Sequence, residues 1–319
     1  MPASQFVAAM LDPSNDAALL DLLAALDAAR YDFVTPTPAT HARILARSTC
    51  GTTVRDLLGW SRAVPPDGLD PILRAAIERA GIVDERADGW RSRIRVTRLR
   101  GRLFIHSAFP TDDEHAVFFG PDSYRFADFI VDELARDSIC RNVVDIGTGS
   151  GVGLIVASGP AAPARFAMTD INAAALAFAR INAAHAGTRA EALHGTTLAG
   201  WDDDIDLALA NPPYLIDDAE RTYRHGGDML GAQLSLDMST EIAARLAPGG
   251  RLLLYTGSAI VSGVDGFRAA LRDAAASANC TLRYHELDPD VFGEELDRPA
   301  YADAGVERIA AVGAVLTRR

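Results

Sequence analysis

The segment Asn142–Val156, NVVDIGTGSGVGLIV, constrains the fold more than any other part of this chain. An apolar run containing Val143, Val144 and Ile146 leads into a turn with four glycines, and a second apolar run leaves it. This pattern predicts a buried strand, a glycine-rich loop and the start of a helix. Glycine lets the backbone turn sharply and approach a ligand closely. Open α/β sheets bind ligands at the carboxyl ends of their strands, so we expect this loop to line a ligand site.

The spacing of the glycines separates the possible nucleotide cofactors. The dinucleotide fingerprint requires a third glycine three residues after the second. Counted from Gly147 and Gly149, that position is Val152, and counted from Gly149 and Gly151 it is Leu154. The spacing therefore argues against a nicotinamide cofactor.

Two carboxylates accompany the loop. Asp145 precedes it, and Asp170 ends the next apolar segment, Arg165–Asp170. A carboxylate at a second strand end, about 20 residues further on, can accept hydrogen bonds from both ribose hydroxyls of an adenosine. The alternative for Asp170 is that it caps the following helix.

The tetrapeptide Asn211–Tyr214, NPPY, follows a strand predicted over Ile205–Ala210. With the glycine loop and the acidic strand end, in this order and spacing, it resembles the class I S-adenosylmethionine-dependent methyltransferases that methylate planar nitrogens. The chain is most similar to the protein-glutamine N5-methyltransferases that modify peptide-chain release factors. The resemblance covers about Phe118 to Arg319 and includes His225–Gly231, HGGDMLG, which is similar to a Gly-Gly-Glu/Asp segment of those enzymes.

The residue types in NPPY suit methylation of an amide or exocyclic amine. The lone pair of such a nitrogen is delocalised, so the nitrogen is a poor nucleophile. The side-chain oxygen of Asn211 and the carbonyl of Pro212 can each accept an N–H hydrogen bond and so aim the lone pair at the methyl group. Pro212 and Pro213 restrict the backbone, and Tyr214 can stack on the planar group. The alternative for the motif is an ordinary strand-to-loop turn.

The resemblance implies S-adenosylmethionine as cofactor and assigns three sets of residues. NPPY is implied as the catalytic motif: Asn211, Pro212, Pro213 and Tyr214. The implied cofactor-binding residues are Asp145, Gly147, Thr148, Gly149, Ser150, Gly151, Asp170, Ile171, Asn172, Thr196 and Asn211. The implied substrate-binding residues are Phe119, Pro121, Asp122 and Tyr124.

The substrate-binding set departs from the pattern of the family. Tyr124 stands roughly where the glutamine enzymes usually have an acidic residue, which leaves the acceptor open. The alternative for Asp122 and Ser123 is capping of the helix that begins there.

The predicted fold class is α/β, with two domains in 319 residues of which 49% are apolar. Residues 113–319 should form a Rossmann-like, seven-stranded, mostly parallel sheet with helices on both faces and a reversed final strand. Its predicted strands are 142–146, 165–170, 190–196, 205–210, 251–256, 281–287 and 309–317, and its predicted helices include 172–187, 229–247 and 266–277. Residues 1–112 should form a smaller, mainly helical, winged-helix-like domain. Its predicted helices are 16–30, 40–48, 53–60 and 70–80, followed by a hairpin of strands 91–97 and 102–107.

Charge bears on the choice of partner. The net charge is −12, and residues 119–319 carry 17 Arg against 28 Asp and Glu, which argues against duplex nucleic acid as the main substrate. However, seven arginines lie between Arg86 and Arg102 against one acid, Asp88. This hairpin is either a wing that docks on RNA or on an acidic protein, or a solvated hairpin face.

The sequence contains no pattern typical of a membrane span, a signal peptide, a disulfide framework or a metal site. There is no apolar stretch of membrane-spanning length and no basic leader before an apolar run, so we expect neither a membrane span nor a signal peptide. Cys50, Cys140 and Cys280 are few and widely spaced, which fits a reducing cytoplasm and predicts neither disulfides nor a metal site.

The predicted function is S-adenosylmethionine-dependent transfer of a methyl group to a planar nitrogen, foremost the glutamine amide of a release-factor-like protein. The first alternative is adenine N6 or guanine N2 in structured RNA or in DNA, which the same four residues would serve. A small-molecule acceptor and a non-catalytic S-adenosylmethionine sensor are further alternatives.

Overall fold

The computed structural model describes residues 15–47, 50–111, 113, 115–136, 141–159, 165–198, 200–217 and 224–319. The chain forms two compact units. The first unit comprises Met1–Tyr124, Gly149–Ile155 and Ala173–Arg189, and the second comprises Arg125–Thr148, Val156–Asn172 and Ala190–Arg319. The chain therefore passes between the units several times, whereas the sequence predicts a single boundary at residues 112–113, which stays a prediction. Cys140 lies outside the described residues.

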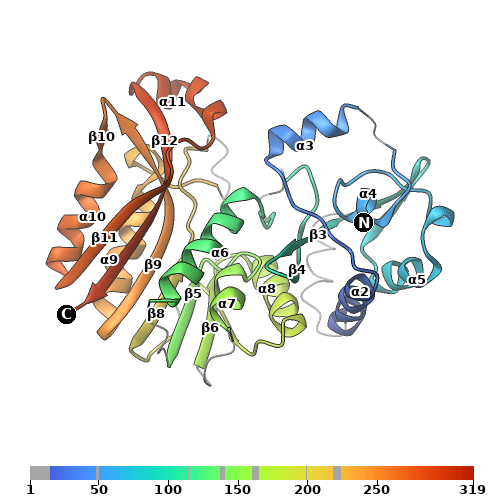
Figure 1. The fold of residues 1–319 in the computed structure, drawn as a ribbon, viewed down its shortest axis with the longest axis horizontal. Helices are drawn as coiled ribbons and strands as arrows, with labels where there is room; N and C mark the ends of the chain where they lie inside the picture. The colour runs from blue at the N-terminus through green and yellow to red at the C-terminus, as the bar shows by residue number, and fades with distance from the viewer. Residues whose placement is uncertain are drawn as a thin grey trace. The chain divides into compact units, whose positions relative to one another are not determined.

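The second unit contains the sheet that the sequence predicts (Figure 1). Its order is β11-β12-β9-β8-β5-β6-β7, and the two-residue β10 pairs with β9. Strands β9, β8, β5, β6 and β7 are parallel, while β12 is antiparallel to both β9 and β11. The strands are β5 (Asn142–Ile146), β6 (Arg165–Asp170), β7 (Glu191–His194), β8 (Ile205–Ala210), β9 (Leu246–Val261), β10 (Val264–Asp265), β11 (Cys280–Asp288) and β12 (Val306–Arg318). The predicted fold class is confirmed.

Alternation along the strands explains how helices cover this sheet. Leu252 and Leu254 of β9 pack with α9 (Gln233–Arg245) and α10 (Gly266–Ser277) in one apolar core. Tyr255, with the opposite parity, contacts Phe126 of α6 (Pro121–Leu134). Because successive strand residues point to opposite faces, these helices cover different sides of the sheet. The central strands are buried on both faces, as parallel strands between helices must be.

The first unit is built from short helices and two hairpins around its own core. Its helices are α2 (Asp16–Ala28), α3 (Pro38–Leu45), α4 (Val54–Leu58), η2 (Pro66–Gly68), α5 (Pro71–Ala80), α7 (Val152–Ala157), which ends in the second unit, and α8 (Ala173–His185). Its strands are β1 (Val83–Arg86), β2 (Gly89–Ser92), β3 (Ile94–Leu99) and β4 (Arg102–Ser107). Local signals set the ends of α5, because Asp70 caps its first turn and Gly81 takes a left-handed conformation after its last.

The start predicted for the first strand of the N-terminal hairpin is wrong. Arg91 belongs to β2, which pairs with β1, and the strand that pairs with β4 begins at Ile94. Two hairpins therefore replace the single one predicted. The alternating pattern continues through both, so the sequence gives no mark where one hairpin ends and the next begins.

The largest differences from the predicted bounds in the second unit occur at three elements. The helix predicted over 229–247 begins at Gln233, because Met229 and Leu230 are left-handed in a 3-10 turn, η3 (Met229–Gly231). The strand predicted over 251–256 begins at Leu246, with an irregularity between the pairs made by Ile205 and Leu207. The loop predicted over 288–304 contains η4 (Gly293–Asp297) and α11 (Pro299–Ala302).

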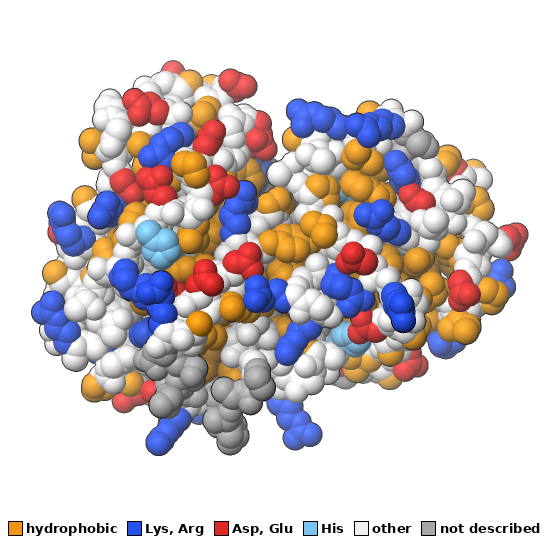
Figure 2. Space-filling view, in the orientation of Figure 1, with side chains coloured by type: hydrophobic (Ala, Val, Ile, Leu, Met, Phe, Trp, Pro, Cys, Tyr) orange, Lys and Arg blue, Asp and Glu red, His pale blue; other side chains and the backbone are white. Residues whose placement is uncertain are grey.

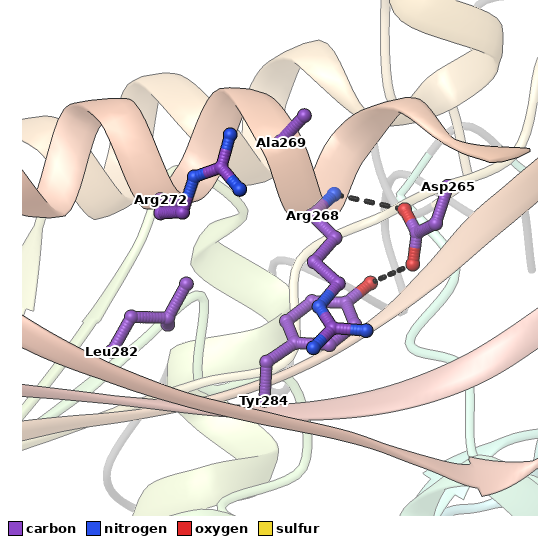
Figure 3. A pocket seen from close by; sticks show the side chains of 6 residues that line it. All are labelled: Asp265, Arg268, Ala269, Arg272, Leu282 and Tyr284. Carbon is purple, nitrogen blue, oxygen red and sulfur yellow. Dashed lines mark hydrogen bonds between the residues drawn. The ribbon is translucent and has the colours of Figure 1, made fainter.

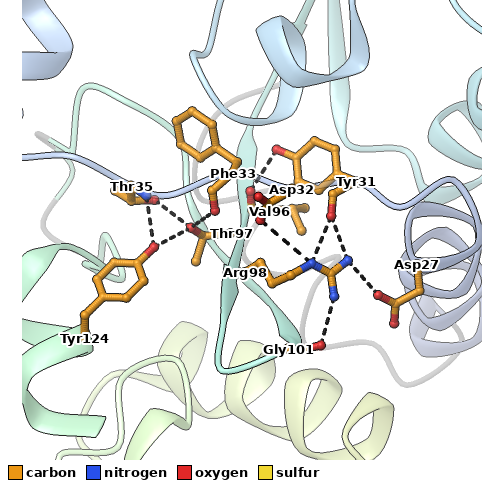
Figure 4. Close-up of polar contacts among 10 residues, drawn as sticks. All are labelled: Asp27, Tyr31, Asp32, Phe33, Thr35, Val96, Thr97, Arg98, Gly101 and Tyr124. Carbon is orange, nitrogen blue, oxygen red and sulfur yellow. Dashed lines mark hydrogen bonds and ion pairs between the residues drawn. The ribbon is translucent and has the colours of Figure 1, made fainter. Parts of the chain in front are cut away.

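The arginines of the first unit's hairpins are largely engaged within that unit. Arg93 pairs with Asp84, and Arg91 lies 3.2 Å from Asp88. Arg98 donates to the Tyr31 and Gly101 carbonyls at 2.7 and 2.9 Å and lies 2.8 Å from Asp27 (Figure 4). These contacts give the basic residues a structural role and weaken the interpretation of the hairpin as an RNA-docking wing.

Candidate active site

Three parallel strands of the second unit end side by side. Ile146 at the end of β5 pairs with Thr169 of β6 and with Ala210 of β8. The residues that follow these strands therefore lie at one edge of the sheet. The predicted Asp145–Thr148, Asp170–Asn172 and Asn211–Tyr214 are brought together in this way.

Hydrogen bonds fix the loop that follows β5. The Thr148 hydroxyl donates to the buried carboxylate of Asp145 at 2.6 Å, and the Thr148 N–H donates to the Thr169 carbonyl at 3.0 Å. Gly147, Gly149 and Gly151 have φ of 62°, 55° and 84°, a region that favours glycine.

The space beside the start of this loop is open. A Cβ built on Gly147 would meet no atom within 4 Å. The glycine is thus required by backbone conformation, and a ligand can approach the loop there.

The end of β6 carries a carboxylate beside an exposed apolar side chain. Asp170 Oδ1 accepts the Asn172 N–H at 2.8 Å, in the turn before α8. Asp170 thus shapes this turn, and a carboxylate has further acceptor positions for ribose hydroxyls. Ile171 is 49% exposed, an unusual position for a large apolar residue, and it offers a surface for a ligand ring.

The end of β7 supports this turn. Gly195 N–H donates to the Asp170 carbonyl at 3.0 Å, and the His194 ring lies 3.0 Å from the Ile171 carbonyl. The His194 ring therefore has a backbone partner in this turn. Thr196 follows this strand and is exposed.

The end of β8 presents the NPPY motif. Asn211 is half-buried and makes no hydrogen bond with another residue of the described part of the chain. The Tyr214 ring is buried, with ring centroids of Tyr255 and Phe292 at 6.5 and 6.0 Å. A Cβ on Gly257 would lie 2.1 Å from Tyr214 Cδ2, so this ring packs directly on the β9 backbone. Tyr214 is thus shown in a packing role, and stacking on the acceptor stays a prediction.

The His225–Gly231 segment packs against the backbone of NPPY. A Cβ on Gly226 would lie 2.7 Å from Tyr214 Cα and 1.9 Å from the Gly231 carbonyl oxygen. A Cβ on Gly231 would lie 2.4 Å from the Tyr214 carbonyl oxygen. Gly226 N–H donates to the Leu215 carbonyl at 2.8 Å. Only glycine allows this approach, which explains the glycine pattern noted in the sequence.

A buried carboxylate supports the segment after NPPY. Glu295 pairs with Arg224 and, at 3.0 Å, with Arg298. Arg298 donates to the Ile216 carbonyl at 2.6 Å, and the Ile216 N–H donates to the Tyr301 hydroxyl at 2.9 Å. Residues of the β11–β12 connection therefore hold both backbone groups of Ile216, two residues after Tyr214.

The residues at this edge fit S-adenosylmethionine. The open, glycine-lined turn after β5 suits the methionine portion, Asp170 suits the ribose, and Ile171 suits the adenine. Asn211 lies on the neighbouring strand end, after β8. Within the described residues there is no cluster of three or more His, Cys, Asp or Glu side chains that could hold a metal ion.

The four predicted substrate-binding residues all lie in the first unit. Asp122 is buried at the start of α6, and the Tyr124 hydroxyl accepts the Thr35 N–H at 3.0 Å and lies 3.0 Å from the Thr97 hydroxyl. Phe119 contacts the Tyr124 ring edge-on at 5.5 Å. These contacts give Tyr124 a structural role, and a role of this set, including Pro121, in acceptor binding stays a prediction.

Sequence reasoning missed two supporting residues. Asn182 of α8 is fully buried, accepts the Ile105 N–H at 2.8 Å and donates to the Ile105 and Ser150 carbonyls at 2.9 Å each. It thus links β4 to the glycine loop within the first unit. The sequence feature that could have marked Asn182 is that it is a polar residue on the apolar face of an alanine-rich helix. No feature of the sequence marked Glu295 as a supporting residue, because Arg224 is distant from it in the chain.

A separate hollow of about 370 Å³ lies on α10 and β11 (Figure 3). It is lined by Asp265, Arg268, Ala269, Arg272, Leu282 and Tyr284. It contains none of the predicted site residues, and the Tyr284 hydroxyl donates to Asp265 at 2.7 Å. Along the described residues, no helix is long and apolar enough to cross a membrane.

Comparison with known proteins bears on the activity of the chain. Residues 115–259 match the methyltransferase small domain family. A release factor glutamine methyltransferase of Deinococcus radiodurans is 28% identical over 288 residues, covering 87% of this chain and 96% of that protein. Another from Caulobacter vibrioides is 27% identical, covering 73% and 82%. A ribosomal protein L11 methyltransferase of Geobacter metallireducens is 30% identical, covering 53% of each chain. Residues 115–259 are therefore similar to the methyltransferase small domain family, and the chain is an S-adenosylmethionine-dependent methyltransferase.

Proposed function

We propose that this enzyme methylates a planar nitrogen, and that its acceptor is the side-chain amide of a glutamine in a protein. The observation that carries the proposal is NPPY at the carboxyl end of β8, beside the ends of β5 and β6. Asn211 is half-buried and makes no hydrogen bond within the described chain. Its amide oxygen is therefore available to accept a hydrogen bond from the molecule that receives the methyl group.

The chain's own residues would orient the acceptor. The Asn211 side-chain oxygen and the Pro212 carbonyl accept the two N–H groups of the amide, which turns the nitrogen lone pair towards the methyl group. When bound, S-adenosylmethionine supplies a methyl group on a sulfonium sulfur and leaves as the thioether. The nitrogen gains a positive charge as the N–C bond forms, and the two oxygens stabilise this charge until a proton leaves to solvent.

Two observations favour a protein acceptor over a nucleic acid. The relatives from Deinococcus radiodurans and Caulobacter vibrioides are named release factor glutamine methyltransferases. The relative from Geobacter metallireducens, which covers 53% of each chain, is named for methylation of a ribosomal protein. On the face shown in Figure 2, arginine side chains are interspersed with carboxylates over the second unit and form no continuous basic strip. A backbone of phosphates is bound by such strips.

The test is methyl transfer from methyl-labelled S-adenosylmethionine into a cell extract, with and without nuclease. The proposal expects label in a protein band that survives nuclease and gives N5-methylglutamine on digestion. Label lost with nuclease would replace it by the RNA or DNA alternative. Label in small molecules alone would also overturn it. Cofactor binding with no transfer to any fraction would favour the sensor.

A further inference from the structure

The second half of the glycine loop belongs to the first unit. Gly149–Ile155 lies in that unit together with the β3–β4 hairpin and α8. A Cβ built on Gly151 would lie 3.2 Å from the Cα of Ala179 in α8, tighter than ordinary van der Waals contact. The loop backbone therefore packs directly on α8, and elements of the first unit can fix its position.

Asn182 is the polar residue on the side of α8 that meets the loop. It lies three residues after Ala179, so the two side chains share a face of the helix. Both residues are fully buried. A buried amide requires partners for its N–H and C=O groups, and this requirement makes its place in the structure specific.

The Asn182 side chain joins β4 to the loop. Its Oδ1 accepts the Ile105 N–H at 2.8 Å, and its Nδ2 donates to the Ile105 carbonyl at 2.9 Å. The same nitrogen donates to the Ser150 carbonyl at 2.9 Å. An amide nitrogen carries two N–H groups, so both are engaged, one with the hairpin and one with the loop.

A second contact joins the same strand to the helix after the loop. Arg102, the first residue of β4, donates from Nη1 to the Ile155 carbonyl at 3.1 Å. Ile155 belongs to α7, which begins directly after Gly151. The hairpin therefore holds the chain on both sides of Gly151, at Ser150 through Asn182 and at Ile155 directly.

We infer that Asn182 and Arg102 are positioning residues for S-adenosylmethionine, and that the first unit thereby helps to set the affinity for the cofactor. Glycines give the loop wide backbone freedom, which must be restricted when a ligand binds. Contacts that fix the loop beforehand remove part of this entropic cost from the binding step. Neither side chain needs to touch the cofactor, because each acts through a backbone carbonyl.

This role of the first unit concerns the cofactor and not the acceptor. It depends on the glycine loop being the cofactor loop, and it is independent of whether the acceptor is a glutamine amide. It is a second role for the unit, besides the predicted recognition of the acceptor. Binding of S-adenosylmethionine is therefore measured in the absence of any acceptor.

The first experiment measures the Kd for S-adenosylmethionine by calorimetry in Asn182→Ala. Without the amide, the Ser150 carbonyl loses its partner. If the loop then holds its binding conformation about a tenth of the time, the Kd rises about 10-fold. Hydrogen exchange of the backbone amides in 147–155 should also become faster in the cofactor-free variant, because the loop opens more often.

Thr97→Val is the matched control for lost stability. Thr97 is fully buried in β3, and its hydrogen bonds among the described residues go to Phe33, Thr35 and Tyr124. Both variants should lower the Tm by about 5 °C, and only Asn182→Ala should weaken cofactor binding. An unchanged Kd in Asn182→Ala, or the same rise in both variants, would show a purely structural role and overturn the inference.

Arg102→Met keeps the test decisive if Asn182→Ala does not fold. It removes the bond to the Ile155 carbonyl at a half-buried position, so the fold should tolerate it. We expect a Kd about 3-fold higher, partly restored in Arg102→Lys, which keeps N–H donors. The control is Arg98→Met on the same hairpin, since Arg98 pairs with Asp27 and with backbone carbonyls. A normal Kd in Arg102→Met, or an equal rise in Arg98→Met, would contradict the inference.

Discussion

At the scale of single residues, Asn211 and Asp170 have separable roles. Asn211 lies at the end of β8 and Asp170 at the end of β6, on either side of β5. One is suited to the acceptor and the other to the ribose of the cofactor. Substitution of each should therefore affect a different measurement.

We expect Asn211→Ala to lower kcat by about 10²–10³, the usual effect of removing one group that stabilises developing charge. The Kd for S-adenosylmethionine, measured by calorimetry, should change little. Unchanged turnover in a variant that still binds cofactor would exclude the proposed mechanism.

Asp170→Ala should show the reverse pattern. Loss of charge-assisted hydrogen bonds to two hydroxyls should raise the Kd for S-adenosylmethionine by more than about 10-fold. At saturating cofactor, kcat should return towards that of the wild type. A normal Kd in this variant would remove Asp170 from the cofactor site.

Gly226→Ala tests the steric support of NPPY. The added methyl group would meet the Gly231 carbonyl and Tyr214 Cα, so the motif must shift. A displacement of about 1 Å can cost 10²-fold in rate, and we expect kcat to fall by at least 10-fold. The control is Gly266→Ala, where an added Cβ meets nothing within 4 Å. Equal activity of both variants would show that NPPY tolerates the shift.

At the scale of elements, the β11–β12 connection supports the acceptor motif. It carries Glu295, Arg298 and Tyr301, which hold the chain after Tyr214, and Phe292, which contacts the Tyr214 ring. This connection was predicted as a loop, and it contains two short helices instead. Its residues position the motif through the backbone of Ile216.

Glu295→Gln should therefore affect catalysis as well as stability. The variant removes the buried negative charge that pairs with Arg224 and Arg298, while Asp217 stays 3.6 Å from Arg224, and we expect a cost of about 3 kcal/mol in the free energy of unfolding. We expect kcat to fall by about 10-fold while the Kd for S-adenosylmethionine stays the same. Glu294→Gln, at the exposed neighbouring position, is the control. A stability loss with kcat unchanged would make Glu295 purely structural.

At the scale of the whole molecule, buried histidines make stability depend on pH. The pKa of His41 is lowered to about 4 from 6.5 by burial, then by Arg95, with Arg62 acting in the same direction and the Trp60 carbonyl opposing. Above pH 6.5 the ring is neutral in both states and contributes no pH dependence. As the pH falls from 6.5 towards 4, the unfolded state takes up a proton that the folded state does not, so stability is lost.

We expect the free energy of unfolding, measured in urea, to fall between pH 6.5 and 5 with a contribution from His41 of up to about 1.4 kcal/mol per pH unit. His41→Gln should reduce this slope. Substitution of the exposed His115 by Gln serves as the control and should leave the slope nearly unchanged. A slope unaffected by His41→Gln would show that this ring is not the source.

The sequence alone was enough to predict the class of fold and the residue types that lie at the strand ends. Glycine conformations after β5, the apolar strands and the NPPY tetrapeptide are local signals, because backbone preference and alternation act over a few residues. They sufficed to predict a mostly parallel sheet with a reversed final strand, and NPPY carried the resemblance from which methyltransferase activity was expected. The carboxylates at the ends of β5 and β6 were found for the same reason.

What supports these residues, and which charges are buried, became visible only in the folded chain. Gly226 meets the backbone of Tyr214, and Glu295 meets Arg224 from 71 residues away. The arginine-rich hairpin looked solvated or ligand-binding in the sequence, yet Arg98 is paired and Arg95 is buried without a counter-ion. Burial and pairing depend on groups that the fold brings from elsewhere, and the residue types alone do not specify them.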